Sequence, residues 1–104
     1  MLSISTEFRK GIFFVRLVGR IDNEGYLDDI NQIIDNIGIK YMVLNLNNLN
    51  DISLESVKHI MNYNQKILKK KKYLFICDNS NIRNRLFKNT IPNIKNEIEA
   101  FSLV

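Results

Sequence analysis

The chain has 104 residues, a net charge of +4 and a single cysteine, Cys77. This length is enough for one domain with its own core, residues 1–104, and too small for two. The single cysteine excludes an internal disulfide framework and indicates a reducing compartment. One proline and four glycines exclude a collagenous or disordered chain. Because no secretory signal or membrane-spanning run is evident, we expect a cytoplasmic protein.

The first part of the chain predicts a β-hairpin followed by a helix. Leu2–Phe8 alternates apolar and polar residues, and Ile12–Val18 is a more buried run, with a turn at Arg9–Gly11 between them. From Glu24 onward apolar residues recur on one face at helical spacing, and Gly38 is placed to end this helix. The residues of that face are Leu27, Ile30, Ile34 and Ile37, with Ile33 on their flank.

The central part predicts a buried strand, a loop and a second helix. Tyr41–Leu46 is an apolar run rich in strand formers, typical of a parallel strand covered on both faces, and Asn47–Asp51 is expected to be a loop. The next helix begins near Ser53, whose hydroxyl can cap it, and ends on Lys69–Lys72. Its apolar face is expected to carry Leu54, Val57, Met61 and Leu68, with Ile60 and Ile67 beside them.

The last part predicts a strand, a third helix and a final strand. The strand is Tyr73–Cys77, and the helix covers about Asn81–Lys88 before Thr90–Pro92 interrupts it. The final strand is placed within Lys95–Val104. The order is therefore β-β-α-β-α-β-α-β, in which strands joined through helices require right-handed parallel crossovers. We expect an α/β fold, a mixed sheet with helices largely on one face.

Residues suited to catalysis are sparse. His59 falls on the helix face opposite the apolar residues, which favours a solvated position, and Cys77 ends a buried strand, as a small core residue does. Asp28 and Asp29 suit the dipole of the first helical turns better than a catalytic pair. The chain contains no CxxC or HExxH motif, and its scattered glycines exclude a P-loop and a dinucleotide fingerprint. We therefore expect no enzymatic activity, no cofactor and no metal.

The basic residues allow two interpretations. The positive net charge could indicate a nucleic-acid or anionic-membrane partner. Alternatively, the chain is rich in Asn, Ile and Lys, which have A/T-rich codons, so genome composition alone could produce the same positive net charge. Lys69–Lys72 suits the negative end of a helix dipole. Alternatively, this run could join Arg83, Arg85 and Lys88 in a phosphate-binding patch, although aromatic residues are poorly interleaved with it. We expect no nucleic-acid partner.

Three stretches resemble the STAS domains of bacterial anti-sigma factor antagonists. The strand and "GELD" motif of that family is similar to FFVRLVGRID (Phe13–Asp22), in which Gly19 and Asp22 match. The family's central strand and loop, "hhVLDLsgvsfiDSSG", resembles YMVLNLNNLNDIS (Tyr41–Ser53). The third helix of the family, commonly "spaVrrlf", is similar to SNIRNRLF (Ser80–Phe87). The likeness covers nearly the whole chain, with the three stretches in the right order.

The resemblance implies a phosphorylation switch that this chain alters. In the family, the helix after the central strand opens with Asp-Ser/Thr-Ser-Gly, and an anti-sigma factor with kinase activity phosphorylates the first hydroxyl residue. The added charge abolishes binding, whereas the unmodified domain sequesters the anti-sigma factor. Aligned through the central strand, Ser53 stands where the Asp is expected and Leu54 takes the phosphorylated position, followed by Glu55 and Ser56.

Three interpretations of Ser53–Ser56 remain open. In the first, these residues are a well-capped helix start, with Ser53 as the cap, Glu55 suited to the helix dipole and Leu54 packed inward. In the second, the switch survives one residue earlier, on Ser53. In the third, Ser56 is modified or Glu55 permanently mimics a phosphate.

The function that the resemblance implies is non-enzymatic binding of an anti-sigma factor with serine kinase activity. The expected surface combines the helix start at Asp51–Lys58 with the loop Asp22–Tyr26. Its candidate partner-binding residues are Asp22, Asn23, Asp51, Ser53, Leu54, Glu55, Ser56 and Lys58, and its possible phosphorylation sites are Ser53 and Ser56. One alternative is a STAS subunit of a membrane transport complex that docks on an ATPase. A further alternative is a basic nucleic-acid or anionic-lipid binder.

Overall fold

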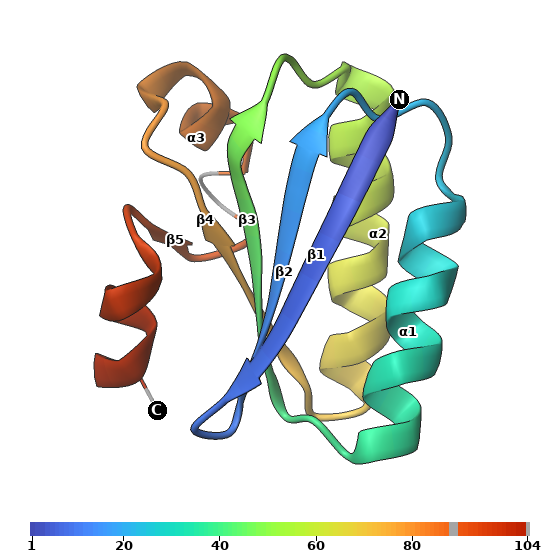
Figure 1. The fold of residues 1–104 in the computed structure, drawn as a ribbon, viewed down its shortest axis with the longest axis vertical. Coiled ribbons are helices and arrows are strands. Elements are labelled where there is room, and N and C mark those ends of the chain that lie inside the picture. Colours follow the sequence, from blue (N-terminus) through green and yellow to red (C-terminus); the bar gives the residue numbers. More distant parts are fainter. Residues whose placement is uncertain (88–89, 104) are drawn as a thin grey trace.

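The computed structural model of the chain describes residues 1–87 and 90–103 and contains one mixed five-stranded sheet (Figure 1). The strands lie in chain order, with β1 and β2 antiparallel and the later neighbours parallel. The predicted element order and fold class are confirmed. The elements are β1 (Leu2–Arg9), β2 (Ile12–Gly19), α1 (Gly25–Ile37), β3 (Tyr41–Leu49), α2 (Leu54–Lys69), β4 (Tyr73–Cys77), α3 (Asn81–Phe87), β5 (Asn93–Ile94) and the 3₁₀ helix η1 (Glu97–Ser102).

The hairpin of β1 and β2 is closed by two residues in the left-handed region. Lys10 has a φ of 51° and Gly11 a φ of 83°, as tight two-residue hairpin turns require. Pairing runs without a shift from Leu2 opposite Gly19 to Arg9 opposite Ile12. The hairpin is therefore confirmed, and β1 is an outermost strand of the sheet.

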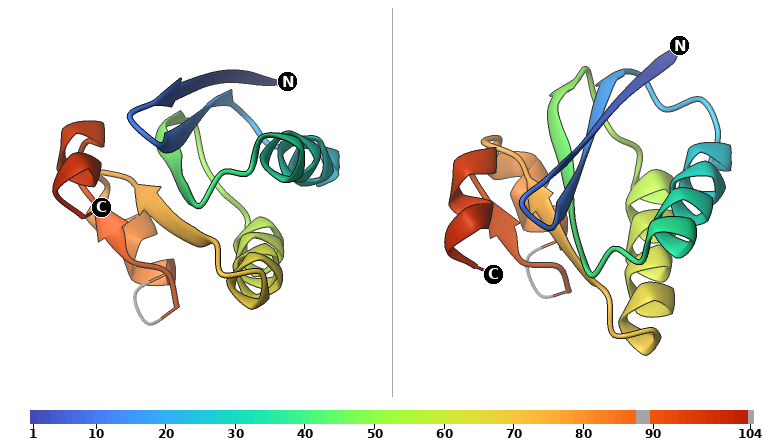
Figure 2. Two further views of the ribbon diagram at one scale, coloured as in Figure 1. Left: turned by 90° about the horizontal axis from the view of Figure 1, so that it is seen from below. Right: turned by 60° about the horizontal axis from the view of Figure 1, so that its bottom comes forward.

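Successive residues of β2 point to opposite faces of the sheet and divide the core in two. Phe13, Val15 and Leu17 belong to the larger core, whereas Ile12 and Phe14 belong to a smaller one. Helices α1 and α2 cover the larger core, and η1 lies on the opposite face (Figure 2). The helices therefore lie largely on one face, as predicted.

Three of the four residues predicted for the inward face of α1 are buried, and Ile37 is the exception. Ile37 is 53% exposed because the helix ends directly after it, at Gly38 with a φ of 66°. Ile39, just beyond this turn, enters the core instead.

The predicted inward face of α2 is wrong at Leu54 and Leu68, which are 67% and 39% exposed. The buried face is centred on Val57, Ile60 and Ile67. A helix turns about 100° per residue, so apolar residues on the flank of the buried face also recur at helical spacing. Leu54 therefore does not pack inward.

The last strand comes earlier in the chain than predicted. Strand β5 is only Asn93–Ile94, and the described part of Lys95–Val104, where we placed the strand, contains η1. The side chain of Asn96 caps η1 by accepting a backbone N–H at 3.1 Å. Ala100 packs in the same small core as Ile94, so a helical turn rather than a strand brings the apolar residues inward.

Strand β3 runs further than predicted, because part of the expected loop Asn47–Asp51 continues the strand to Leu49. The polar side chain of Asn47 is accommodated because it accepts the N–H of Asn79 at 2.7 Å, just beyond the end of β4. Tyr73, which we placed in a buried strand, is 40% exposed at the opposite end of β4.

A charged side chain crosses the face of the sheet that carries η1. Arg16 donates to the two carboxylate oxygens of Glu97 at 2.8 and 2.7 Å, and to Glu7 at 2.8 Å. Asn45 donates to Glu97 at 2.8 Å. These bonds favour the ionised carboxylate and hold the pKa of Glu97 below its usual range, with the bond from Arg16 as the largest cause. The network joins η1 to β2 and β3.

A fully buried carboxylate anchors α3. Asp78 accepts hydrogen bonds from Nε and Nη2 of Arg83 at 2.8 and 3.2 Å. The Nη1 atom of Arg83 donates to the carbonyl of Leu49 at 2.9 Å. Helix α3 is thereby held beside the ends of β3 and β4.

We predict that Glu97 makes the stability of the fold depend on pH. Because folding lowers its pKa from the ordinary 4.5, its contribution is complete above that value and is lost as the pH falls through the folded-state pKa. Glu97→Gln should lower the free energy of unfolding at neutral pH by about 1 kcal/mol and flatten the acid side of the stability curve. Urea unfolding at a series of pH values measures both effects, and an unchanged acid slope in the variant would contradict this assignment.

We also predict that Arg83→Ala destabilises the protein by about 3 kcal/mol, because it leaves the charge of Asp78 buried without its partner. Arg85→Ala, an exposed position on the same helix, is the matched control and should change stability by less than about 0.5 kcal/mol. Thermal and urea unfolding of both variants measure the difference. Equal effects would show that Asp78 does not depend on Arg83.

Candidate functional site

The candidate residues lie at the carboxyl end of the parallel strands, where β2 leads to α1 and β3 leads to α2 (Figure 1). Because β2 and β3 are neighbours, these two connections lie side by side. The N–H of Asn50 donates to the carbonyl of Gly19 at 2.8 Å, and Arg20 lies 3.7 Å from the carboxylate of Asp51. The structure thus brings the loop that contains Asp22 to the same end as the start of α2.

The loop between β2 and α1 contains two of the candidate residues. Asp22 is exposed, and its carboxylate lies 3.3 Å from the amino group of Met1. Asn23 accepts the backbone N–H of Gly25 at 2.9 Å and so supplies a partner for the first turn of α1. The Asn23 side chain is therefore engaged in shaping this loop.

Ser53 begins α2 as predicted. Its hydroxyl accepts the N–H of Ser56 at 3.0 Å, and its carbonyl accepts the N–H of Val57 at 3.0 Å. Glu55 lies in the first turn, where a negative charge suits the helix dipole. The predicted cap at Ser53 is therefore confirmed, whereas Leu54 lies outward instead of packing inward.

A short series of polar contacts connects α2 to the start of α1. The hydroxyl of Ser53 donates to that of Ser56 at 3.0 Å, and Ser56 donates to a carboxylate oxygen of Glu24 at 3.5 Å. Ser56 is buried, with 4% of its surface exposed. Sequence patterns could not reveal the contact between Glu24 and Ser56, because the two residues lie 32 positions apart along the chain.

His59 lies beside these polar contacts, but its imidazole is not aligned for a hydrogen bond with Ser53 or Ser56. Its side chain is 37% exposed, and Nδ1 lies 3.1 Å from the carboxylate of Glu24 but outside hydrogen-bonding alignment. The position is less solvated than we predicted, because Glu24 reaches it from the neighbouring helix. Since Ser56 donates to Glu24, the arrangement has no serine poised on an imidazole base.

The exposed side chains at this end of the sheet combine apolar and charged groups. Leu54, in the first turn of α2, is 67% exposed, and Asp51, Glu55 and Lys58 beside it are exposed as well. Ile82, in the first turn of α3, is 77% exposed. Our sequence interpretation missed Ile82, although an isoleucine directly after a polar helix start is a visible signal for an outward apolar residue.

Several other features bear on chemistry. Over residues 1–87 and 90–103, no group of three or more His, Cys, Asp or Glu side chains could hold a metal ion. No helix in that part of the chain is long and apolar enough to span a bilayer. Cys77 is fully buried, as predicted, and burial raises the pKa of its thiol to about 11, which keeps it protonated at neutral pH.

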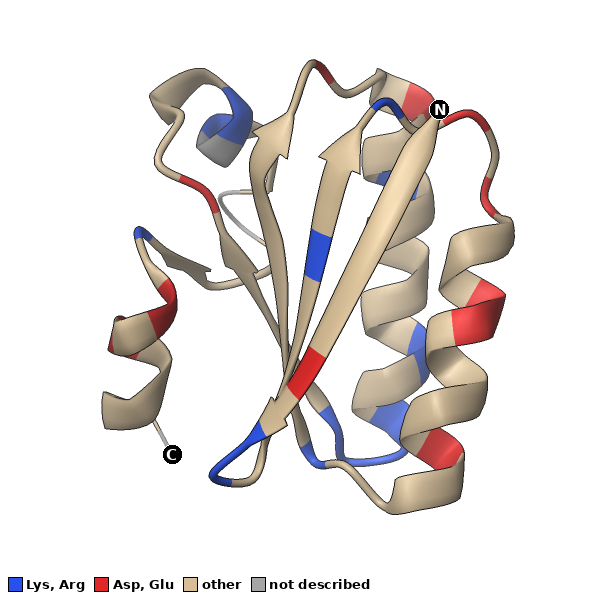
Figure 3. Cartoon of the chain, viewed as in Figure 1, with Lys and Arg blue, Asp and Glu red and all other residues tan. Residues whose placement is uncertain are grey.

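The basic residues considered as one phosphate-binding patch are divided between the two ends of the sheet (Figure 3). Lys69–Lys72 precedes β4, whereas α3 follows it. Two lysines of that run lie 3.3 Å from the carboxylate of Asp35, and Arg83 is paired with Asp78. Lys88 lies outside the described residues. The interpretation in which Lys69–Lys72 and α3 form one continuous phosphate-binding patch is therefore wrong.

No family model matches the chain, and no curated protein matches it. Solved structures match it over almost its whole length. An anti-sigma factor antagonist from Mycobacterium paratuberculosis superposes with a TM-score of 0.83 at 15% identity, covering 100% of this chain and 94% of that one. The anti-sigma factor antagonist SpoIIAA in its unphosphorylated form gives 0.79 at 15% identity, with coverages of 97% and 96%.

An uncharacterized protein with a SpoIIAA-like fold from Shewanella loihica gives a TM-score of 0.60 at 13% identity, covering 98% of this chain and 92% of that one. At such identities the likeness concerns the fold alone. The chain therefore has the STAS fold of the anti-sigma factor antagonists, as the three sequence stretches implied.

Proposed function

We propose that this protein is a non-enzymatic regulatory domain that binds an anti-sigma factor through the start of α2. The observation that carries this proposal is the outward position of Leu54, which is 67% exposed on a helix turn that Ser53 and Ser56 hold in place. An exposed leucine on an ordered turn gains free energy when a partner covers it. The similarity of the fold to anti-sigma factor antagonists suggests what kind of partner that is.

The proposed binding surface extends over both connections at this end of the sheet. Asp22 and Asp51 supply exposed carboxylates, and Glu55 and Lys58 supply charges on α2. Such charges orient a partner and speed its approach, while the apolar side chains supply most of the affinity. Ile82 extends the apolar part of the surface onto α3.

We further propose that binding is not switched by phosphorylation at the position that the resemblance indicates. Leu54 has no hydroxyl, and the hydroxyl of Ser56 is buried between Ser53 and Glu24. A phosphate on Ser56 would add negative charge beside the Glu24 carboxylate and open the contact between α1 and α2. Ser53 is more accessible, but its hydroxyl caps the helix.

Two alternatives stay open. Docking on the ATPase of a membrane transport complex uses the same fold without phosphotransfer, and the loss of the acceptor hydroxyl at Leu54 is compatible with it. Binding of nucleic acid or anionic lipid has weaker support, because the basic residues are divided between two ends and partly paired with acids. Genes for a sigma factor and a kinase, or for transporter subunits, next to the coding gene would separate the first two roles.

We predict that Leu54→Arg weakens binding to the cognate anti-sigma factor at least about tenfold, because it replaces an apolar contact by a charge that must be desolvated. Calorimetric titration of the purified chain with each anti-sigma factor of the same organism identifies the partner and measures the loss. Ile98→Arg, 77% exposed on η1, is the matched control and should bind like the original chain. Equal affinity of both variants would remove Leu54 from the interface.

We also predict the outcome of incubation with that anti-sigma factor and ATP. The original chain should remain unmodified at Ser56, whereas Leu54→Ser, which restores an exposed hydroxyl, should gain one phosphate at position 54. Intact mass and peptide mapping distinguish the sites. A stoichiometric phosphate on Ser53 of the original chain would show that the switch has moved by one residue rather than been lost.

A further inference from the structure

Three turns meet at the end of the molecule that Figure 2 shows from below in its left view. Ile12 pairs with Tyr41, and Tyr41 pairs with Tyr73, so the first residues of β2, β3 and β4 are neighbours in the sheet. The turns directly before these residues are therefore neighbours as well. We call this part of the molecule the turn end, and it comprises residues 9–11, 38–40 and 69–72.

Positive charge is concentrated at the turn end (Figure 3). It holds seven of the 15 lysines and arginines, which are Arg9, Lys10, Lys40, Lys69, Lys70, Lys71 and Lys72. Lys70 and Lys72 pair with Asp35. Over residues 1–87 and 90–103, the remaining cations of this set form no ion pair, and all of them are exposed. The exposed carboxylates of Asp22 and Asp51 lie at the opposite end of the sheet.

An exposed apolar side chain lies just before the basic residues of each turn. Phe8, which is 56% exposed, precedes Arg9 in the hairpin. Ile37 and Leu68 are exposed in the last turns of α1 and α2. Cations flanked by exposed apolar side chains are typical of protein surfaces that lie in the headgroup region of a bilayer.

Two tyrosines at the turn end favour a lipid surface over a nucleic acid. The rings of Tyr41 and Tyr73 stack with centroids 5.8 Å apart, and Nζ of Lys40 lies 5.3 and 6.0 Å from those centroids. Ring faces that are occupied in this way are poorly placed to stack with bases. An exposed apolar side chain such as Phe8 also gains nothing from a phosphate backbone, whereas the boundary of the acyl chains stabilises it.

We propose that the turn end binds the surface of an anionic phospholipid membrane. Each lysine or arginine held near such a surface strengthens binding about fivefold, and the apolar side chains add to this attraction. The basic residues of α3 lie at the other end of the sheet and take no part. The start of α2 lies there too, so Leu54 remains open to a protein partner while the turn end is on the membrane.

Co-sedimentation of the full chain with lipid vesicles tests this binding. We expect the chain to bind vesicles of phosphatidylcholine that contain about 30% phosphatidylglycerol, and not vesicles of phosphatidylcholine alone. Binding should be lost between about 50 mM and about 500 mM salt, because ions screen exposed charges. Equal binding to both kinds of vesicle, or binding to neither, overturns the proposal.

Removal of charge tests whether the turn end is the surface that binds. The double variant Lys40→Gln/Lys69→Gln should bind the anionic vesicles about 25-fold more weakly. Arg85→Gln/Lys95→Gln is the matched control, because it removes two exposed cations that follow the carboxyl ends of β4 and β5, and it should bind like the original chain. Equal losses in the two variants would mean that only net charge matters, and would overturn the assignment to the turn end. Thermal melting checks that both variants stay folded.

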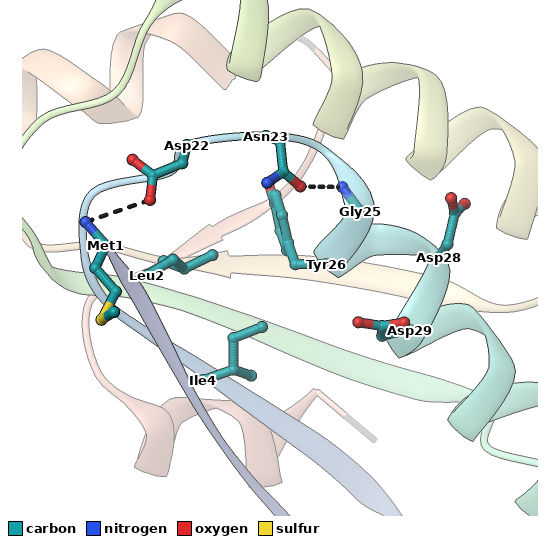
Figure 4. A pocket seen from close by; sticks show the side chains of 9 residues that line it. All are labelled: Met1, Leu2, Ile4, Asp22, Asn23, Gly25, Tyr26, Asp28 and Asp29. Carbon is teal, nitrogen blue, oxygen red and sulfur yellow. Dashed lines mark hydrogen bonds and ion pairs between the residues drawn. The ribbon is translucent and has the colours of Figure 1, made fainter.

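An introduced tryptophan tests the orientation, because the chain has none of its own. The fluorescence of Phe8→Trp should move to shorter wavelength when anionic vesicles are added. Ile4→Trp is the control on the same face of β1, roughly 13 Å from Phe8. Ile4 lines a cavity with Asp22 and Asp29, whose charges keep that part of the molecule away from an anionic surface (Figure 4). An equal shift in both variants, or none in Phe8→Trp, overturns the proposed orientation.

A labelled single-stranded DNA is the second probe of the original chain. Binding of this DNA without binding of anionic vesicles would assign the turn end to nucleic acid and overturn the proposal. Titration of the charge variants with the anti-sigma factor keeps the two proposals separate, because Leu54 lies at the opposite end and its binding should not change.

Discussion

The parallel pairing of β2 with β3 is the constraint on which the rest of the site depends. Parallel neighbours end at the same edge of a sheet, so the connections to α1 and α2 must emerge side by side. The backbone bond from Asn50 to Gly19 joins those connections directly. Every candidate residue, although drawn from two distant parts of the sequence, is brought to one end by this arrangement.

At that end, hydrogen bonding and exposure are divided between neighbouring residues. Ser53 and Ser56 use their hydroxyls to hold the first turn of α2 and to connect it to Glu24 of the neighbouring connection. Leu54 lies between them in the sequence but projects outward. The turn is therefore ordered by its polar residues and exposes an apolar one.

The sequence by itself determined the order of the elements, the hairpin and the Ser53 cap, because alternation, helical spacing and capping depend on residues close together in the chain. Only the tertiary structure decided that Leu54 faces outward and that Asp78 is fully buried, so that its charge needs Arg83 as a partner. It alone replaced the expected last strand by η1, through the long-range pairing of Arg16 with Glu97. Which face of an apolar helix is covered, and which charge is paired, depends on neighbours that local patterns do not contain.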